Sequence, residues 1–125
     1  MKEIMTTIIL NNGGEQKEYK EQKVLYYTRG KVNFYQFTIH AATFTIAVLQ
    51  DKVYIYSKNT FRYRLKLEKN KEIQNSIQTA YGHFFTDVKL TKLEYQQMSK
   101  CNLTLEYILN FSGYRQYLFL HLKEE

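Results

Sequence analysis

The feature of this sequence that most limits its fold is an alternation of apolar and polar residues that runs through nearly the whole chain. In TFRYRLKLE, residues 60–68, apolar side chains occupy every second position and polar or charged ones the positions between them. The segment NLTLEYILNFS, residues 102–112, follows the same pattern with one exception at Ile108. A period of two places alternate side chains on opposite faces of a β-strand. Each segment therefore predicts an antiparallel strand with one buried and one solvated face.

Further strands are predicted wherever Tyr, Phe, Ile, Val and Thr gather between short turn sequences. These strands cover residues 3–10, 17–28, 32–39, 43–50, 52–57, 73–80, 83–92 and 115–123. Turn residues lie at 11–15, 50–52, 58–59 and 112–113. Residues 93–100, LEYQQMSK, are the candidate for a non-strand insertion, either one or two helical turns or a wide loop.

The number of strands limits how they can be arranged. About eight to ten strands in 125 residues cannot remain one flat open sheet, because sheets twist and exposed edges invite aggregation. Closure into an up-and-down barrel removes both edges, and a two-sheet sandwich is the alternative that the pattern leaves open. The length fits one domain, residues 1–125. We therefore expect a single all-β domain, an antiparallel barrel with little or no helix.

Composition predicts a cytoplasmic location. The one cysteine, Cys101, cannot form an intramolecular disulfide, which fits a reducing compartment. The N-terminal run MKEIMTTIIL is short and broken by threonines, so it does not resemble a signal peptide. No stretch approaches the roughly 18 consecutive apolar residues of a membrane helix. We expect a soluble protein with no membrane partner.

The segment QTAYGHFFTD, residues 78–87, holds the chain's most suggestive cluster of polar side chains. On a straight strand, however, the Cα atoms of His83 and Asp87 lie roughly 13 Å apart, too far for a hydrogen-bonded catalytic pair. His40 and His121 show no metal-ligand spacing, and no nucleophile elbow or phosphate-binding loop is present. The sequence therefore predicts a protein that is not an enzyme and has no catalytic residue, metal or cofactor.

A net charge of +6 raises the question of an acidic partner. A basic stripe follows the strand at 60–68 and the turn before it, with members Lys58, Arg62, Arg64 and Lys66. A nucleic-acid surface would need aromatic side chains on the same face, but Phe61 and Tyr63 point away. A solvated outer face is the favoured interpretation. Binding of nucleic acid or of an acidic protein partner is the alternative.

A ligand cavity inside the barrel is the preferred functional hypothesis. A barrel of eight to ten strands can be filled by side chains or can hold one small ligand. The chain has 12 Tyr and 8 Phe residues, which offer large surfaces and polar hydroxyls to line such a cavity. The candidate ligand-binding residues are Tyr63, Tyr81, His83 and Tyr107.

Residues 51–90, followed by 102–124, resemble the YwiB-like bacterial family of unknown function. The resemblance lies in the order of a hairpin, a basic strand, a strand that ends in Thr79-x-Tyr81-Gly82, and a C-terminal hairpin that begins Leu-x-Leu-x-Tyr. It implies a calycin-like, lipocalin-type β-barrel in the bacterial cytoplasm and no established activity. The chain departs from the family pattern at residues 57–59 and at Gln36, so a family function that needs an Arg–Glu pair is in doubt here.

Overall fold

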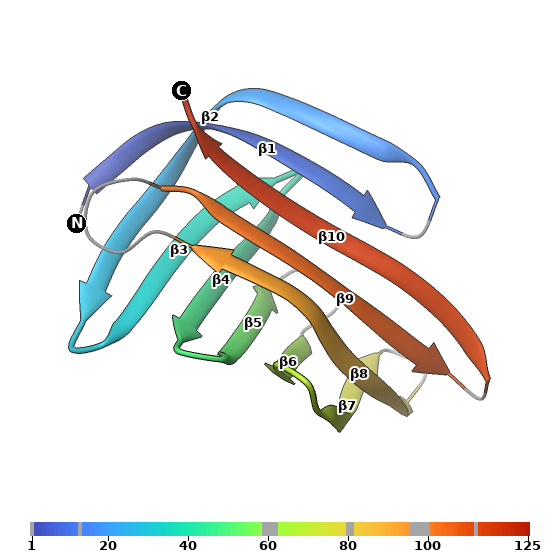
Figure 1. The fold of residues 1–125 in the computed structure, drawn as a ribbon. Coiled ribbons are helices and arrows are strands. Elements are labelled where there is room, and N and C mark those ends of the chain that lie inside the picture. Colours follow the sequence, from blue (N-terminus) through green and yellow to red (C-terminus); the bar gives the residue numbers. More distant parts are fainter. Residues whose placement is uncertain (1, 13, 59–62, 80–81, 96–100, 112) are drawn as a thin grey trace.

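The chain folds into a strongly curved antiparallel sheet in a computed structural model (Figure 1), which describes residues 2–12, 14–58, 63–79, 82–95, 101–111 and 113–125. These residues form ten strands and no helix. The strands are β1 (Lys2–Asn12), β2 (Gln16–Arg29), β3 (Val32–Ile39), β4 (Ala42–Leu49), β5 (Lys52–Lys58), β6 (Tyr63–Glu68), β7 (Glu72–Thr79), β8 (Gly82–Tyr95), β9 (Leu103–Phe111) and β10 (Tyr114–Glu124).

Strands that follow one another in the chain pair with each other, except β6 and β7, and β1 also pairs with β10. The resulting order is β6-β5-β4-β3-β2-β1-β10-β9-β8-β7, with every ladder antiparallel. Both ends of this order come from the middle of the chain, so the sheet curls until β6 and β7 lie side by side (Figure 1). The predicted up-and-down barrel is confirmed as a nearly closed one.

The strand β8 corrects the prediction of a non-strand segment that begins at residue 93. β8 continues to Tyr95, which pairs with Leu103 of β9. Its register shifts between Leu90 and Lys92, and this bulge reverses which alternate positions face inward. Leu93 and Tyr95 consequently pack against the core, although their positions are out of phase with Leu90. Residues 96–100 lie outside the described residues.

A side-chain amide helps to close the barrel where β6 meets β7. The backbone N–H of Lys66 donates to Asn75 Oδ1 at 2.8 Å, and Asn75 Nδ2 donates to the Lys66 carbonyl at 3.0 Å. The turn beside it adds one antiparallel bridge and an ion pair of 3.3 Å between Lys71 and Glu68. The Asn75 side chain is largely buried, and its amide takes the place of two backbone hydrogen bonds between β6 and β7.

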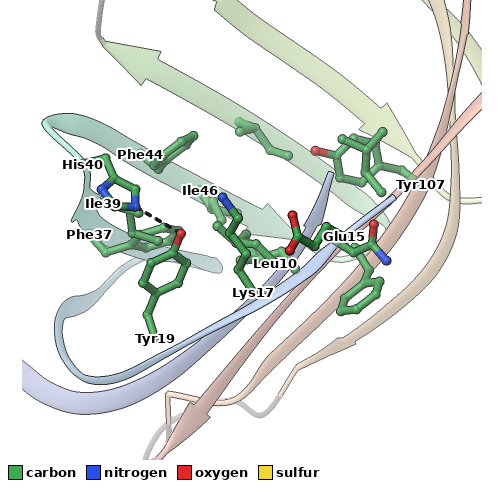
Figure 2. Close-up of a pocket in the computed structure, with 15 residues that line it drawn as sticks. Leu10, Glu15, Lys17, Tyr19, Phe37, Ile39, His40, Phe44, Ile46 and Tyr107 are labelled. Atoms are coloured by element: carbon green, nitrogen blue, oxygen red, sulfur yellow. Dashed lines mark hydrogen bonds between the residues drawn. The ribbon is translucent and has the colours of Figure 1, made fainter. Parts of the chain in front are cut away.

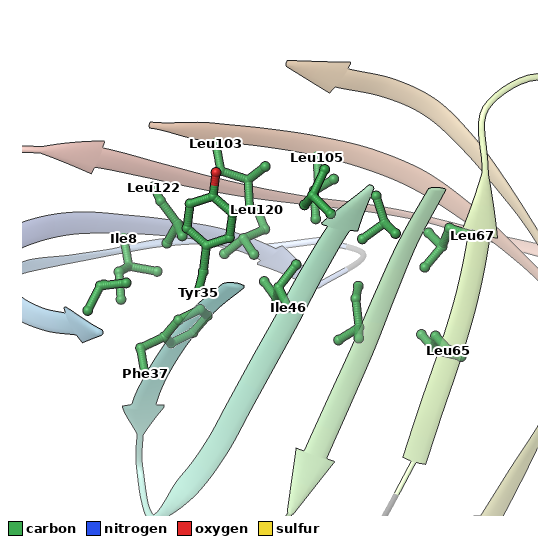
Figure 3. Packing of buried hydrophobic residues seen from close by; sticks show 14 of the residues in the cluster. Ile8, Tyr35, Phe37, Ile46, Leu65, Leu67, Leu103, Leu105, Leu120 and Leu122 are labelled. Atoms are coloured by element: carbon green, nitrogen blue, oxygen red, sulfur yellow. The ribbon is translucent and has the colours of Figure 1, made fainter. Parts of the chain in front are cut away.

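Apolar side chains from all around the barrel meet in its interior (Figure 3). Those that are essentially inaccessible to solvent include Ile8, Val24, Tyr35, Leu67, Leu103 and Leu105. On β6 the alternation holds as predicted, because Leu65 and Leu67 are buried while Arg64 and Lys66 are exposed. In QTAYGHFFTD, β7 ends at Thr79, which pairs with Gly82 at the start of β8, while residues 80–81 of the predicted bend lie outside the described residues.

The barrel wall parts between β2 and β3. Their ladder covers only residues 25–29 of β2 and 32–36 of β3, although β2 begins at Gln16 and β3 reaches Ile39. Near this parting, β2 has a residue with positive φ, Glu21 at 56°, where its register with β1 shifts. The Glu125 carboxylate accepts hydrogen bonds from the Thr7 hydroxyl and the Glu21 N–H, which lower its pKa and hold this irregular segment against β1. The first half of β2 therefore follows β1 away from β3.

Candidate ligand-binding cavity

A cavity of about 470 Å³ lies inside the barrel behind this parting. Its volume falls within the range of roughly 300–1,000 Å³ that is typical of small-molecule sites. Most of the strands around it contribute side chains, and Figure 2 shows how several of them converge. The lining residues are Leu10, Asn11, Glu15, Lys17, Tyr19, Phe37, Ile39, His40, Phe44, Ile46, Ile55, Tyr107, Leu118, Phe119 and Leu120.

The lining changes from apolar to polar between the inside of the barrel and its surface. Ile46, Ile55 and Leu120 are buried and bring only hydrocarbon to the deep part of the cavity. Glu15, Lys17 and His40 are exposed, so the cavity reaches solvent where they lie. A ligand that matched this lining would bury an apolar part and leave a polar part near the surface.

Two stacked phenylalanines form one wall of the cavity. The rings of Phe37 on β3 and Phe44 on β4 are 5.4 Å apart between centroids and inclined by 24°. The two residues pair directly across the β3–β4 ladder, which fixes their mutual position. This wall gives a flat apolar surface against which hydrocarbon or an aromatic ring can pack.

A hydrogen bond between side chains spans the parting at the mouth of the cavity. The Tyr19 hydroxyl on β2 lies 3.2 Å from His40 Nε2, and the two rings meet edge to face (Figure 2). His40 and Ala41 form the two-residue turn between β3 and β4, and both have positive φ, 48° and 63°. That backbone conformation is costly for residues with a Cβ. A strained turn therefore holds His40 at the mouth.

A second group of polar side chains lies in the packed part of the barrel, apart from the cavity lining. The hydroxyls of Tyr26 and Tyr35 and the Asn33 amide nitrogen are buried without a hydrogen-bond partner among the described residues. Burial strongly raises the pKa of Tyr35, and the nearby Tyr26 hydroxyl adds to the effect. Burial also raises the pKa of Cys101 from 9.0 to about 11. Both groups are therefore neutral at physiological pH, and the Cys101 thiol is a poor nucleophile.

Of the four sequence-predicted ligand residues, the structure describes the side chains of Tyr107 and His83. Tyr107 on β9 lines the cavity. His83 is exposed on β8 and does not line it. Tyr81 lies outside the described residues, as does the side chain of Tyr63, although the backbone of Tyr63 belongs to β6.

The strand pairing places two aromatic side chains on the same face as the basic stripe. Arg64 and Lys66 pair with Tyr56 and Tyr54 of β5, so these four side chains share the outer face of the sheet. The Arg64 guanidinium lies 5.1 Å from the centroid of the Tyr56 ring, a cation–π contact. Lys58 is exposed at the end of β5, and Arg62 lies outside the described residues. Tyr54 and Tyr56 are near the stripe in the sequence, but only the pairing of β5 with β6 shows that they share its face.

The described residues hold few other groups that could support chemistry. No three His, Cys, Asp or Glu side chains among them lie close enough together to bind a metal ion. His83 and Asp87 occupy alternate positions of one continuous strand, so no direct catalytic pair forms between them. Within the part of the chain that the structure describes, no helix is long and apolar enough to cross a membrane.

Sequence reasoning missed the polar side chains at the mouth. Lys17 and Tyr19 lie on β2 before its bulge, where the predicted strand showed no clear apolar face. Their common function in the lining depends on where β2 parts from β3, and this is a property of the ladder. His40 was considered only as a metal ligand. The sequence signal that could have singled out His40 was its place in a two-residue turn that lacks glycine.

The comparisons with known proteins find a likeness of fold. No family model matches the sequence, and the search of curated proteins finds no match. Among solved structures, the crystal structure of the YwiB protein from Bacillus subtilis is similar, with a TM-score of 0.67. The alignment covers 98% of this chain and 90% of that chain at 6% sequence identity. Nearly the whole barrel is therefore shared with YwiB, as the sequence resemblance predicted.

Proposed function

We propose that this protein is a non-enzymatic cytoplasmic binding protein whose barrel takes up a small, partly apolar molecule. The observation that carries the proposal is the cavity of about 470 Å³, with an apolar interior and a polar mouth. A molecule of liquid water occupies about 30 Å³, so this volume corresponds to roughly fifteen waters and suits a ligand of ten to twenty non-hydrogen atoms. The Phe37–Phe44 wall gives such a ligand a large surface to contact.

An uncharged fluorescent ligand tests the proposal without any assumption about the polar end. We expect N-phenyl-1-naphthylamine to bind saturably, with increased fluorescence. Leu118 lines the cavity, so Leu118→Trp should fill part of it and weaken binding at least tenfold. Leu25→Trp is the matched control, because Leu25 lies on β2 outside the cavity lining. Circular dichroism would verify that both variants fold. Equal binding by the two variants would contradict the proposal.

Native mass spectrometry of protein purified from its own host gives an independent test. We expect a bound small molecule that leaves on denaturation. Leu118→Trp should carry less of it than Leu25→Trp does. A ligand retained equally by both variants would place binding outside the cavity.

The aromatic neighbours of the basic stripe favour a second candidate function, binding of single-stranded nucleic acid. Tyr54 and Tyr56 offer rings beside Lys66 and Arg64, the combination that stacks bases and neutralises phosphates. We expect an oligothymidylate to bind at low salt, with affinity that falls steeply as salt rises. Tyr56→Ala should then weaken binding more than Tyr117→Ala, since Tyr117 is exposed on the distant strand β10. Absence of binding at low salt would exclude this function.

A further inference from the structure

The side chains at the mouth of the cavity indicate what kind of polar group a ligand would present there. The deep lining residues Phe37, Ile46 and Leu120 carry no polar side-chain atom, so a charged group placed among them would lose its hydration without compensation. The polar side chains of the lining lie mainly at the exposed end. A ligand would therefore bind with its apolar part inward and its polar group at the mouth.

The strand β2 brings two hydrogen-bond donors to this mouth. Lys17 and Tyr19 are two residues apart, so they lie on the same side of the strand, roughly 7 Å from each other along it. Figure 2 shows both side chains directed toward the cavity. Lys17 forms no ion pair with any described residue, and its ammonium group can meet an anion without first losing a partner.

The hydrogen bond between Tyr19 and His40 leaves one hydrogen available. When His40 Nε2 carries a proton and donates it to the Tyr19 oxygen, the Tyr19 O–H can donate to a third group. A carboxylate at the mouth would select this tautomer, because it can accept from both Tyr19 and Lys17. A cationic or purely apolar group would leave both donors unused.

Among the described lining residues, Glu15 provides the carboxylate at the mouth, and it limits the charge of the ligand. It is exposed and lies two residues before Lys17 in the chain. A second negative charge on the ligand would meet this carboxylate as well as the Lys17 ammonium, and like charges at close range repel. The mouth thus suits a single anionic group.

From these contacts we infer that the cavity takes a monocarboxylate with an apolar body. Its carboxylate lies at the mouth, where Lys17 and Tyr19 bind it. The inference rests on the proposed function and adds the chemical class of the ligand to it. It places the charged group near solvent, while the stacked Phe37–Phe44 wall and the aliphatic interior contact the hydrocarbon.

Competition against N-phenyl-1-naphthylamine tests the inference with four ligands that share an eight-carbon chain: octanoate, 1-octanol, octylamine and 2-aminooctanoate. We expect octanoate to displace the fluorescent ligand at about one fifth of the concentration that octanol needs, as for a partly exposed charge-assisted contact. Lys17→Met should abolish this preference, and Tyr19→Phe should reduce it. Lys23→Met, an exposed lysine of β2 outside the lining, is the matched control.

The outcomes separate the inference from the proposed function. The preference is the ratio of the octanol and octanoate concentrations measured on one variant, so it does not depend on how tightly that variant binds the fluorescent ligand. Lys23→Met should keep the wild-type ratio and the wild-type affinity for the fluorescent ligand. If the fluorescent ligand binds but octanoate and octanol compete equally, the inference is wrong and the proposed function stands. A preference for octylamine or for 2-aminooctanoate would indicate that Glu15 recognises the polar group of the ligand, and it would also overturn the inference. If the fluorescent ligand does not bind at all, both proposals fail.

Discussion

Two single residues in the packed part of the barrel should make its free energy of unfolding fall at alkaline pH. Cys101 and Tyr35 are inaccessible to solvent, and burial raises the pKa of each. In the unfolded chain both groups ionise at lower pH, so the folded state is favoured only while they stay protonated. The Cys101 contribution is complete below pH 9 and is lost as pH rises through about 11. Tyr35 adds a loss above pH 10.

We therefore expect the free energy of unfolding to fall more steeply for the wild type than for Cys101→Ala when pH rises from 8 to 10.5. The difference in this fall should be about 2 kcal/mol, which urea titrations at both pH values can resolve. Tyr117→Phe removes an exposed hydroxyl and should leave the wild-type dependence unchanged. Parallel curves for the wild type and Cys101→Ala would mean that the folded thiol ionises as freely as the unfolded one.

At the scale of elements, the turn between β3 and β4 carries strain that its sequence does not relieve. Two-residue hairpins of this kind need positive φ at both positions, which Asn-Gly supplies at low cost. Here His40 and Ala41 adopt it. The strands on either side were nevertheless predicted correctly from alternation, because side-chain period is local and survives an unfavourable turn. The bulge in β8 was not predictable in this way, since it changes the phase of alternation at Lys92 and Leu93.

Ala41→Gly should stabilise the protein by about 1 kcal/mol, because glycine adopts positive φ without the Cβ clash. For a chain of this size the midpoint of thermal unfolding should rise by about 4 °C. The adjacent Ala42→Gly is the control with the opposite sign: Ala42 is buried in β4, and glycine in a strand costs about 0.5–1 kcal/mol. A lower melting temperature for Ala41→Gly would show that the turn needs its methyl group.

At the scale of the whole molecule, two features decide the form of the barrel, and neither is a local pattern. One is the contact between β6 and β7, where Asn75 substitutes for backbone pairing. The other is the parting of β2 from β3, which brings Lys17 and Tyr19 to the cavity. Alternation predicted the strands, and their number together with the cost of exposed edges favoured an antiparallel barrel. It could not predict where the wall parts, because ladder length depends on partners far away in the chain.

Asn75→Ala should cost about 2 kcal/mol, since it leaves the N–H and carbonyl of Lys66 without their side-chain partners in a partly buried site. Chemical denaturation would measure the loss. Gln74→Ala removes an amide from the exposed neighbouring position and should change stability by less than about 0.5 kcal/mol. Similar losses for the two variants would indicate that backbone groups alone hold β6 against β7.

The parted wall also decides how a molecule could reach the interior. Elsewhere around the sheet, except at the contact between β6 and β7, widening a gap between neighbouring strands would break consecutive backbone hydrogen bonds. At the mouth, β2 and the β3–β4 hairpin are joined across the parting by the contact between Tyr19 and His40. One such hydrogen bond is worth about 1 kcal/mol. Exchange between the cavity and solvent can therefore proceed on the timescale of side-chain motion, without any step that resembles unfolding.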